Sequence, residues 1–178
     1  CHAQIETAMR LSDGASPLEQ AMVAALSQRV QKPHIVPMAE FNRWDDAYSD
    51  AMRAIYQKHP ENADLAALFV EGMMTRTPWK MWDLPSGMPA EGADTTECQQ
   101  VLEAAFANDP AAMQHPGLLH LYVHLMEMSP FPERALKAGD ALRTLVPDAG
   151  HLVHMPTHID VLCGNYSDVV LWNQKAVE

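Results

Sequence analysis

Helix-length segments of 10 to 16 residues, separated by proline and glycine, recur along the whole 178-residue sequence. No stretch alternates apolar and polar residues for long enough to predict a convincing β-strand. One helix start is explicit, because Ser16 can cap the helix, Pro17 suits its first position and Glu19 can reach back to the cap. Further helices are expected over residues 2–11 and 63–78. These features predict an all-α protein.

The later helices carry a repeated spacing. In its first copy a small residue is followed by leucine after seven positions and by proline after five more: Ala135, Leu142 and Pro147. In the second copy Val169 and Ala176 have the same seven-residue spacing, and Gly164 and Tyr166 precede them. Val169 follows Ala135 by 34 residues, which is the period of a tetratricopeptide repeat. We therefore expect a degenerate α-solenoid of roughly three to four antiparallel helical hairpins.

This reading makes residues 1–178 a single tetratricopeptide-like repeat domain. Both ends lie within helical patterns, and the chain starts at Cys1 rather than at methionine. We expect the chain to be an internal fragment of a longer protein.

Histidine is concentrated in one segment. Residues 115–158 hold six of the nine histidines of the chain. Two sets of residues within this segment have the three- or four-residue spacing that places side chains on one helix face. The first set is His120, His124 and Glu127, and the second is His151, His154 and His158.

The two sets are expected to meet across neighbouring helices. A helix is predicted to start near Pro156 and to carry His158, with His151 and His154 in the turn before it. Imidazole nitrogens and one carboxylate suit a divalent transition metal, either Zn, Fe, Mn or Cu. We predict that all six residues contribute to a metal site on the concave face of the solenoid.

Six ligands are too many for one tetrahedral ion. Some of the six could orient the others, the site could hold more than one metal, or fewer side chains could converge than the spacing suggests. Two alternative interpretations of the histidine pattern involve no metal: the residues form a buried polar network, or they are unrelated histidines on the surface.

Composition excludes several functions. Twelve basic and 23 acidic side chains give a formal charge of -11, which argues against nucleic acid as a partner. No apolar run reaches the roughly 18 residues of a membrane span. The three cysteines, Cys1, Cys98 and Cys163, have no disulfide or zinc-finger spacing. Localisation stays open, with the cytoplasm as the default.

Six segments resemble a family of bacterial and fungal tetratricopeptide-repeat proteins of poorly defined function. They are SPLEQAMVAAL, DDAYSDAM, TPWKMWD, HPGLLHLYVHLMEMSPFPERAL, VPDAGHLVHMPTHI and GNYSDVV. The resemblance implies a tetratricopeptide superhelix and marks the same six residues as signature positions. The sequence departs from the family pattern at Asp160, where the family tends to have an aromatic residue. This change either removes a shared ligand pocket or adds a carboxylate to the site.

Two functions follow from these patterns. The first is a metalloprotein whose ion leaves a position open for water or substrate, as a metalloenzyme requires. The second is an interaction scaffold that binds a protein, peptide or small molecule in its concave groove, with the histidines as a structural network. Trp79 and Trp82 lie on a Pro/Gly-rich loop. We expect this loop to pack on the helices; capping a ligand cleft is the alternative.

Overall fold

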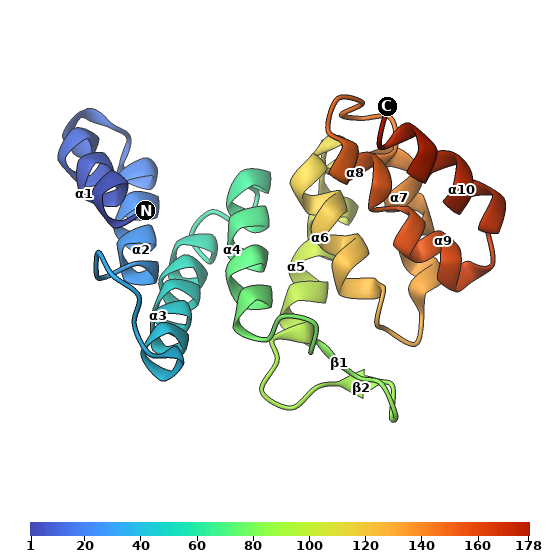
Figure 1. The fold of residues 1–178 in the computed structure, drawn as a ribbon. Coiled ribbons are helices and arrows are strands. Elements are labelled where there is room, and N and C mark those ends of the chain that lie inside the picture. Colours follow the sequence, from blue (N-terminus) through green and yellow to red (C-terminus); the bar gives the residue numbers. More distant parts are fainter. The chain divides into compact units, whose positions relative to one another are not determined.

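A computed structural model describes all 178 residues and is predominantly helical (Figure 1). The all-α prediction is confirmed. Residue contacts divide the chain into two compact units, Cys1–Arg76 and Thr77–Glu178. All six predicted site residues belong to the second unit. No helix is both long enough and apolar enough to cross a membrane.

The first unit consists of four α-helices and a short 3-10 turn. They are α1 (His2–Leu11), η1 (Ser12–Gly14), α2 (Pro17–Arg29), α3 (Met38–Tyr56) and α4 (Ala63–Arg76). The predicted cap of α2 is confirmed, because the Ser16 hydroxyl accepts a hydrogen bond from the Glu19 amide, and the Glu19 carboxylate accepts one from the Ser16 amide. Helices α2, α3 and α4 pack in chain order around the buried side chains of Met52, Leu65 and Phe69.

The second unit begins with a loop that forms a very short hairpin. Strand β1 (Trp82–Asp83) pairs antiparallel with β2 (Met88–Pro89), with Trp82 opposite Pro89. The indole of Trp82 is buried and donates a hydrogen bond of 2.7 Å to the Leu125 carbonyl. The expected packing of the loop on the helices is therefore confirmed at Trp82.

The remainder of this unit is helical. Its elements are α5 (Thr95–Asn108), η2 (Pro110–Gln114), α6 (Pro116–Met126), η3 (Pro132–Ala135), α7 (Leu136–Leu142), α8 (Gly150–His154), α9 (Thr157–Cys163) and α10 (Tyr166–Lys175). Helix α6 packs against α5 and α7, and α9 packs against α10. Gly164 ends α9 with a φ of 81°, a left-handed conformation that glycine adopts without strain.

Helices α8 and α9 form one helical path with a break at a proline. Met155 and Pro156, which separate them, both have right-handed helical backbone angles. Pro156 has no amide hydrogen to continue the ladder of backbone hydrogen bonds, so the helix is interrupted there. The predicted helix start near Pro156 is confirmed, but the expected turn before it is wrong, since His151 and His154 lie on α8.

Asp160 does not supply a carboxylate to the histidine cluster. Its side chain is completely buried and receives two hydrogen bonds from the Arg143 guanidinium, at 2.7 and 2.8 Å. Arg143 also lies over the ring of Trp172, with 5.4 Å between the guanidinium carbon and the ring centre. This paired arrangement satisfies the buried charge and connects α9 to the segment after α7.

Candidate metal centre

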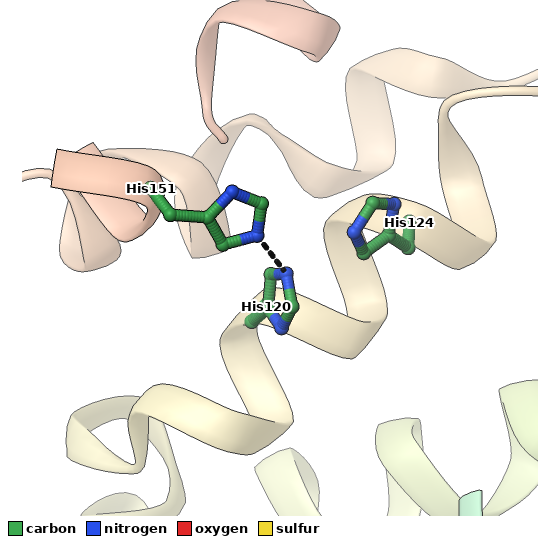
Figure 2. A group of neighbouring side chains, drawn as sticks. All are labelled: His120, His124 and His151. Atoms are coloured by element: carbon green, nitrogen blue, oxygen red, sulfur yellow. Dashed lines mark hydrogen bonds between the residues drawn. The ribbon is translucent and has the colours of Figure 1, made fainter. Parts of the chain in front are cut away.

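Three histidines from two helices lie together (Figure 2). His120 and His124 are one turn apart on α6, and His151 lies on α8. One ring nitrogen of each lies within 4.8 Å of the corresponding nitrogens of the other two. Nε2 of His120 and Nε2 of His151 are 3.1 Å apart. These three histidines are close enough to hold a metal ion.

The composition of α6 explains why two imidazoles share one side of it. Apart from Gly117, Tyr122 and the two histidines, every residue of α6 is apolar. Leu118, Leu119, Val123, Leu125 and Met126 are fully buried. Since this apolar surface packs into the core, the four-residue spacing leaves both histidines on the side that faces α8 and α9.

Glu127 follows the last residue of α6 and holds two of the imidazoles. Its Oε1 is 3.0 Å from Nδ1 of His124, and its Oε2 contacts Nδ1 of His158 on α9. The carboxylate is buried, with 8% of its side chain exposed. Burial by itself raises the pKa of Glu127, but the hydrogen bonds from His124 and His158 outweigh it and lower the pKa to about 2. Glu127 is therefore ionised at neutral pH and can only accept these hydrogen bonds.

His154 is held by a residue that sequence reasoning did not identify. Its Nδ1 is 2.7 Å from Oδ1 of Asn173 on α10. The Asn173 amide nitrogen donates to the Val169 carbonyl at 2.8 Å and to the Thr157 hydroxyl at 3.2 Å. A carbonyl oxygen can only accept, so the Asn173 nitrogen must face Val169 and its oxygen must face His154.

The second pair of facing nitrogens lies between His154 and His158. Their Nε2 atoms are 2.9 Å apart, and the ring centres are 4.8 Å apart. His158 also approaches the first group, with 6.1 Å between its ring centre and that of His124. The cluster is therefore continuous across α6, α8 and α9.

The electrostatic environment favours the neutral imidazole at His120 and at His151. Burial lowers the pKa of His120, and the proximity of His124 and His151 lowers it further, to about 4. Burial also lowers the pKa of His151, with a smaller effect from other histidines of the cluster. A neutral imidazole keeps a lone pair that can bind a metal, so these nitrogens are ready to act as ligands at neutral pH.

A hollow of about 520 Å³ opens beside the cluster. Its polar wall contains Glu127, His154, Thr157, His158 and Asn173. Its apolar wall contains Trp79, Met128, Val161, Leu162 and Val169. The hollow therefore combines imidazole and carboxylate groups with a largely apolar lining, as in many small-molecule sites.

Trp79 lies at this hollow in an unusual backbone conformation. Its φ of 60° is the only positive value at a residue other than glycine, and 64% of the residue is exposed. The edge of one ring faces the other between Trp79 and His124, with centres 5.7 Å apart. Trp79 lines this hollow, whereas the Trp82 indole donates to the Leu125 carbonyl; the alternative from the sequence, capping of a ligand cleft, stays a prediction.

The six predicted residues form one connected cluster. Hydrogen bonds or ring contacts link His120 with His151 and His124, and Glu127 joins His124 to the pair of His158 and His154. His151 is exposed and the other five are partly buried. The surface-histidine reading therefore does not describe the group as a whole. Metal binding by all six stays a prediction.

Two contributors had no signal in the sequence. Thr157 is the first residue of α9 and Asn173 lies on α10, and neither belongs to a set of residues with helical spacing. By contrast, His115 lies in the histidine-rich segment but caps the N-terminus of α6, because its Nδ1 accepts a hydrogen bond from the Leu118 amide. Composition alone does not separate such a helix cap from a site residue.

Comparisons with protein-family models, with curated proteins and with solved structures find no match to this chain. The geometry of the cluster therefore carries the functional argument.

Proposed function

We propose that this protein binds a divalent transition metal through His120, His124 and His151. The observation that carries the proposal is the proximity of their three ring nitrogens, all within 4.8 Å of one another. Nitrogen ligands of one tetrahedral ion lie about 3.4 Å apart at metal–nitrogen distances of about 2.05 Å. The His120–His151 pair is close to that separation at 3.1 Å, and the ligand nitrogen of His124 lies within 4.8 Å of both.

The donor set and its supports suit such an ion. Imidazole ligands fit Zn, Fe, Mn or Cu, and no cysteine belongs to the cluster. Glu127 accepts a hydrogen bond from Nδ1 of His124, which leaves Nε2 of that ring for the metal. This is the carboxylate–histidine arrangement that orients ligands in metal sites. A bound ion would supply a Lewis acid that polarises a carbonyl group or acidifies a water molecule.

The proposal is tested by metal content and affinity. Protein freed of metal with a chelator should bind added Zn²⁺ or Co²⁺ in calorimetry, and His120→Ala should weaken binding at least tenfold. His59→Ala, a histidine outside the cluster, should bind as the unmodified protein does. Absence of binding for all of these ions would overturn the proposal.

We also infer that the second unit is arranged as tetratricopeptide hairpins. The support is the pairing of α6 with α7 and of α9 with α10, together with the 34-residue offset between Ala135 and Val169. In that arrangement the histidine-bearing helices are the first helices of successive hairpins. An experimental structure that placed α6 and α9 on opposite sides of α7 would exclude it.

A ligand-binding scaffold is the second candidate. It is favoured by the apolar wall of the hollow, where Val161 is 46% and Leu162 is 53% exposed. A peptide or small molecule with an apolar surface could bury these side chains. If the protein is a scaffold, the peptide or small molecule should still bind after a chelator has removed any metal. If the protein is a metalloprotein, a molecule that binds at the site should no longer bind once the metal is removed.

A further inference from the structure

We propose that Nε2 of His154 and Nε2 of His158 hold a second divalent metal, separate from the one assigned to His120, His124 and His151. This inference rests on the proposed function, because it extends the same cluster to a two-metal site. The ability of the two nitrogens to bind an ion depends on where the ring hydrogens of these two residues lie.

The hydrogen of His154 is fixed by Asn173. The Asn173 nitrogen donates to the Val169 carbonyl, so its oxygen faces Nδ1 of His154 at 2.7 Å. An amide oxygen needs a donor, and Nδ1 of His154 must therefore carry a hydrogen. In the neutral imidazole this leaves a lone pair on Nε2.

The hydrogen of His158 is fixed by Glu127. Each oxygen of the Glu127 carboxylate faces one ring nitrogen, Nδ1 of His124 or Nδ1 of His158, so the carboxylate accepts from both rings and Nδ1 of His158 carries a hydrogen as well. In the neutral imidazole the lone pair again lies on Nε2. Asn173 lies on α10 and Glu127 follows α6, so each ring is oriented by a group from another part of the fold. A flip of either ring would lose the hydrogen bond made by its Nδ1.

Two lone pairs therefore face each other at 2.9 Å. Two acceptors at this distance repel unless a positive charge lies between or beside them. A divalent ion bound to both nitrogens supplies that charge, and the 2.9 Å separation is close to the roughly 3.4 Å between nitrogen ligands of a tetrahedral ion. A single shared proton is the competing explanation, and metal stoichiometry distinguishes the two.

The second position also has access from outside. His154 and His158 line the hollow of about 520 Å³, whereas His120, His124 and His151 do not. The remaining coordination positions of an ion at His154 and His158 can therefore be filled by water or by an oxygen donor of a ligand whose apolar part contacts Val161 and Leu162. Glu127 joins the two halves of the site through His124 and His158.

The test is metal stoichiometry in the full chain. Zn²⁺ titration by calorimetry and Co²⁺ titration by visible absorption should give two equivalents for the unmodified protein. The double variant His154→Gln/His158→Gln should retain one equivalent, and His120→Gln/His151→Gln should retain the other. Circular dichroism should show that each variant keeps its helical content.

Two single substitutions that leave all the histidines in place test the second metal position with less risk of misfolding. Asn173→Ala removes the acceptor of His154 and should weaken the second equivalent by about 10- to 100-fold. Gln174→Ala, an exposed amide on the same helix, should weaken neither.

The outcomes separate the two proposals. One equivalent in the unmodified protein that survives His154→Gln/His158→Gln would overturn the second position and leave the proposed function standing, with a proton between the two rings. One equivalent lost in both double variants would likewise overturn it, because all the histidines would then serve a single ion. Absence of any bound metal would overturn both proposals.

Discussion

Glu127 at the end of α6 and His158 on α9, 31 residues later in the chain, share a hydrogen bond between a carboxylate oxygen and Nδ1. The other oxygen of the same carboxylate accepts from His124. One buried carboxylate thus fixes the ring orientation of a histidine from each of the two predicted sets. This bridge gives the first prediction.

Replacing Glu127 with glutamine should weaken metal binding by about 10- to 100-fold. The amide replaces one of the two acceptor oxygens with an NH2 donor, so either Nδ1 of His124 or Nδ1 of His158 would face a donor instead of an acceptor. Calorimetric titration with Zn²⁺ measures the change. Glu133→Gln, which alters an exposed carboxylate of the same unit, is the control. Equal affinities for the two variants would contradict an orienting role for Glu127.

The tautomers of three histidines can be observed directly. His124, His154 and His158 should carry their hydrogens on Nδ1, because each Nδ1 faces Glu127 or Asn173. Nitrogen-15 NMR of the metal-loaded protein distinguishes the two ring nitrogens. A hydrogen on Nε2 of His154 or His158 would be incompatible with the second metal position.

Acid should destabilise the metal-free protein before carboxylates are protonated. The pKa of His120 is lowered from 6.5 to about 4, chiefly by burial. As pH falls below 6.5 the unfolded chain therefore takes up a proton that the folded chain does not, and the free energy of unfolding falls until the pH reaches about 4. Urea unfolding at several pH values measures this decline. His120→Gln should make it shallower, while His59→Gln should leave it unchanged.

Protonation of Glu127 should also lower the free energy of unfolding as the pH falls, but over a lower pH range. Its pKa is lowered from 4.5 to about 2, so its contribution to folding is complete above 4.5 and is lost as pH falls through about 2. Glu127→Gln should therefore flatten the stability profile below pH 4.5 and leave the slope between 6.5 and 4.5 largely intact.

The Arg143–Asp160 pair should be structural. Asp160→Ala leaves the buried guanidinium without its bidentate partner, and we expect a loss of about 3–5 kcal/mol in the free energy of unfolding. Arg143→Met/Asp160→Leu should recover much of this loss, because both charges are then removed together. Thermal or denaturant unfolding measures the difference. If Asp160→Ala remained folded but lost metal, the assignment of Asp160 outside the site would fail.

Gly150, the first residue of α8, should not tolerate a side chain. A Cβ atom there would lie 2.3 Å from the Ala176 carbonyl oxygen, so the backbone after α10 or the start of α8 must shift. We expect Gly150→Ala to cost about 1–3 kcal/mol, the usual range for overpacking. Gly14→Ala is the matched control, since a Cβ there meets nothing within 4 Å. Equal melting temperatures for Gly150→Ala and Gly14→Ala would show that the backbone around Ala176 can shift without loss of stability.

Much of the local structure could be predicted from the sequence. The helix over residues 2–11 and the capped start of α2 are confirmed, because helix formation and capping depend on residues within one or two turns. The spacing of His120 and His124 likewise placed them on one face of α6. The same local reasoning was wrong for His151 and His154, since both lie on helix α8 and the turn before α9 consists of Met155 and Pro156 alone.

The sequence by itself determined that this protein is helical and that its histidines come in two sets with helical spacing. Only the tertiary structure decided that His151 joins His120 and His124, that Glu127 connects the sets, and that Asp160 pairs with Arg143. It also brought Asn173 to His154 from another helix. The physical reason is that helix periodicity comes from hydrogen bonds four residues apart, whereas the facing of two ring nitrogens depends on how separate helices pack.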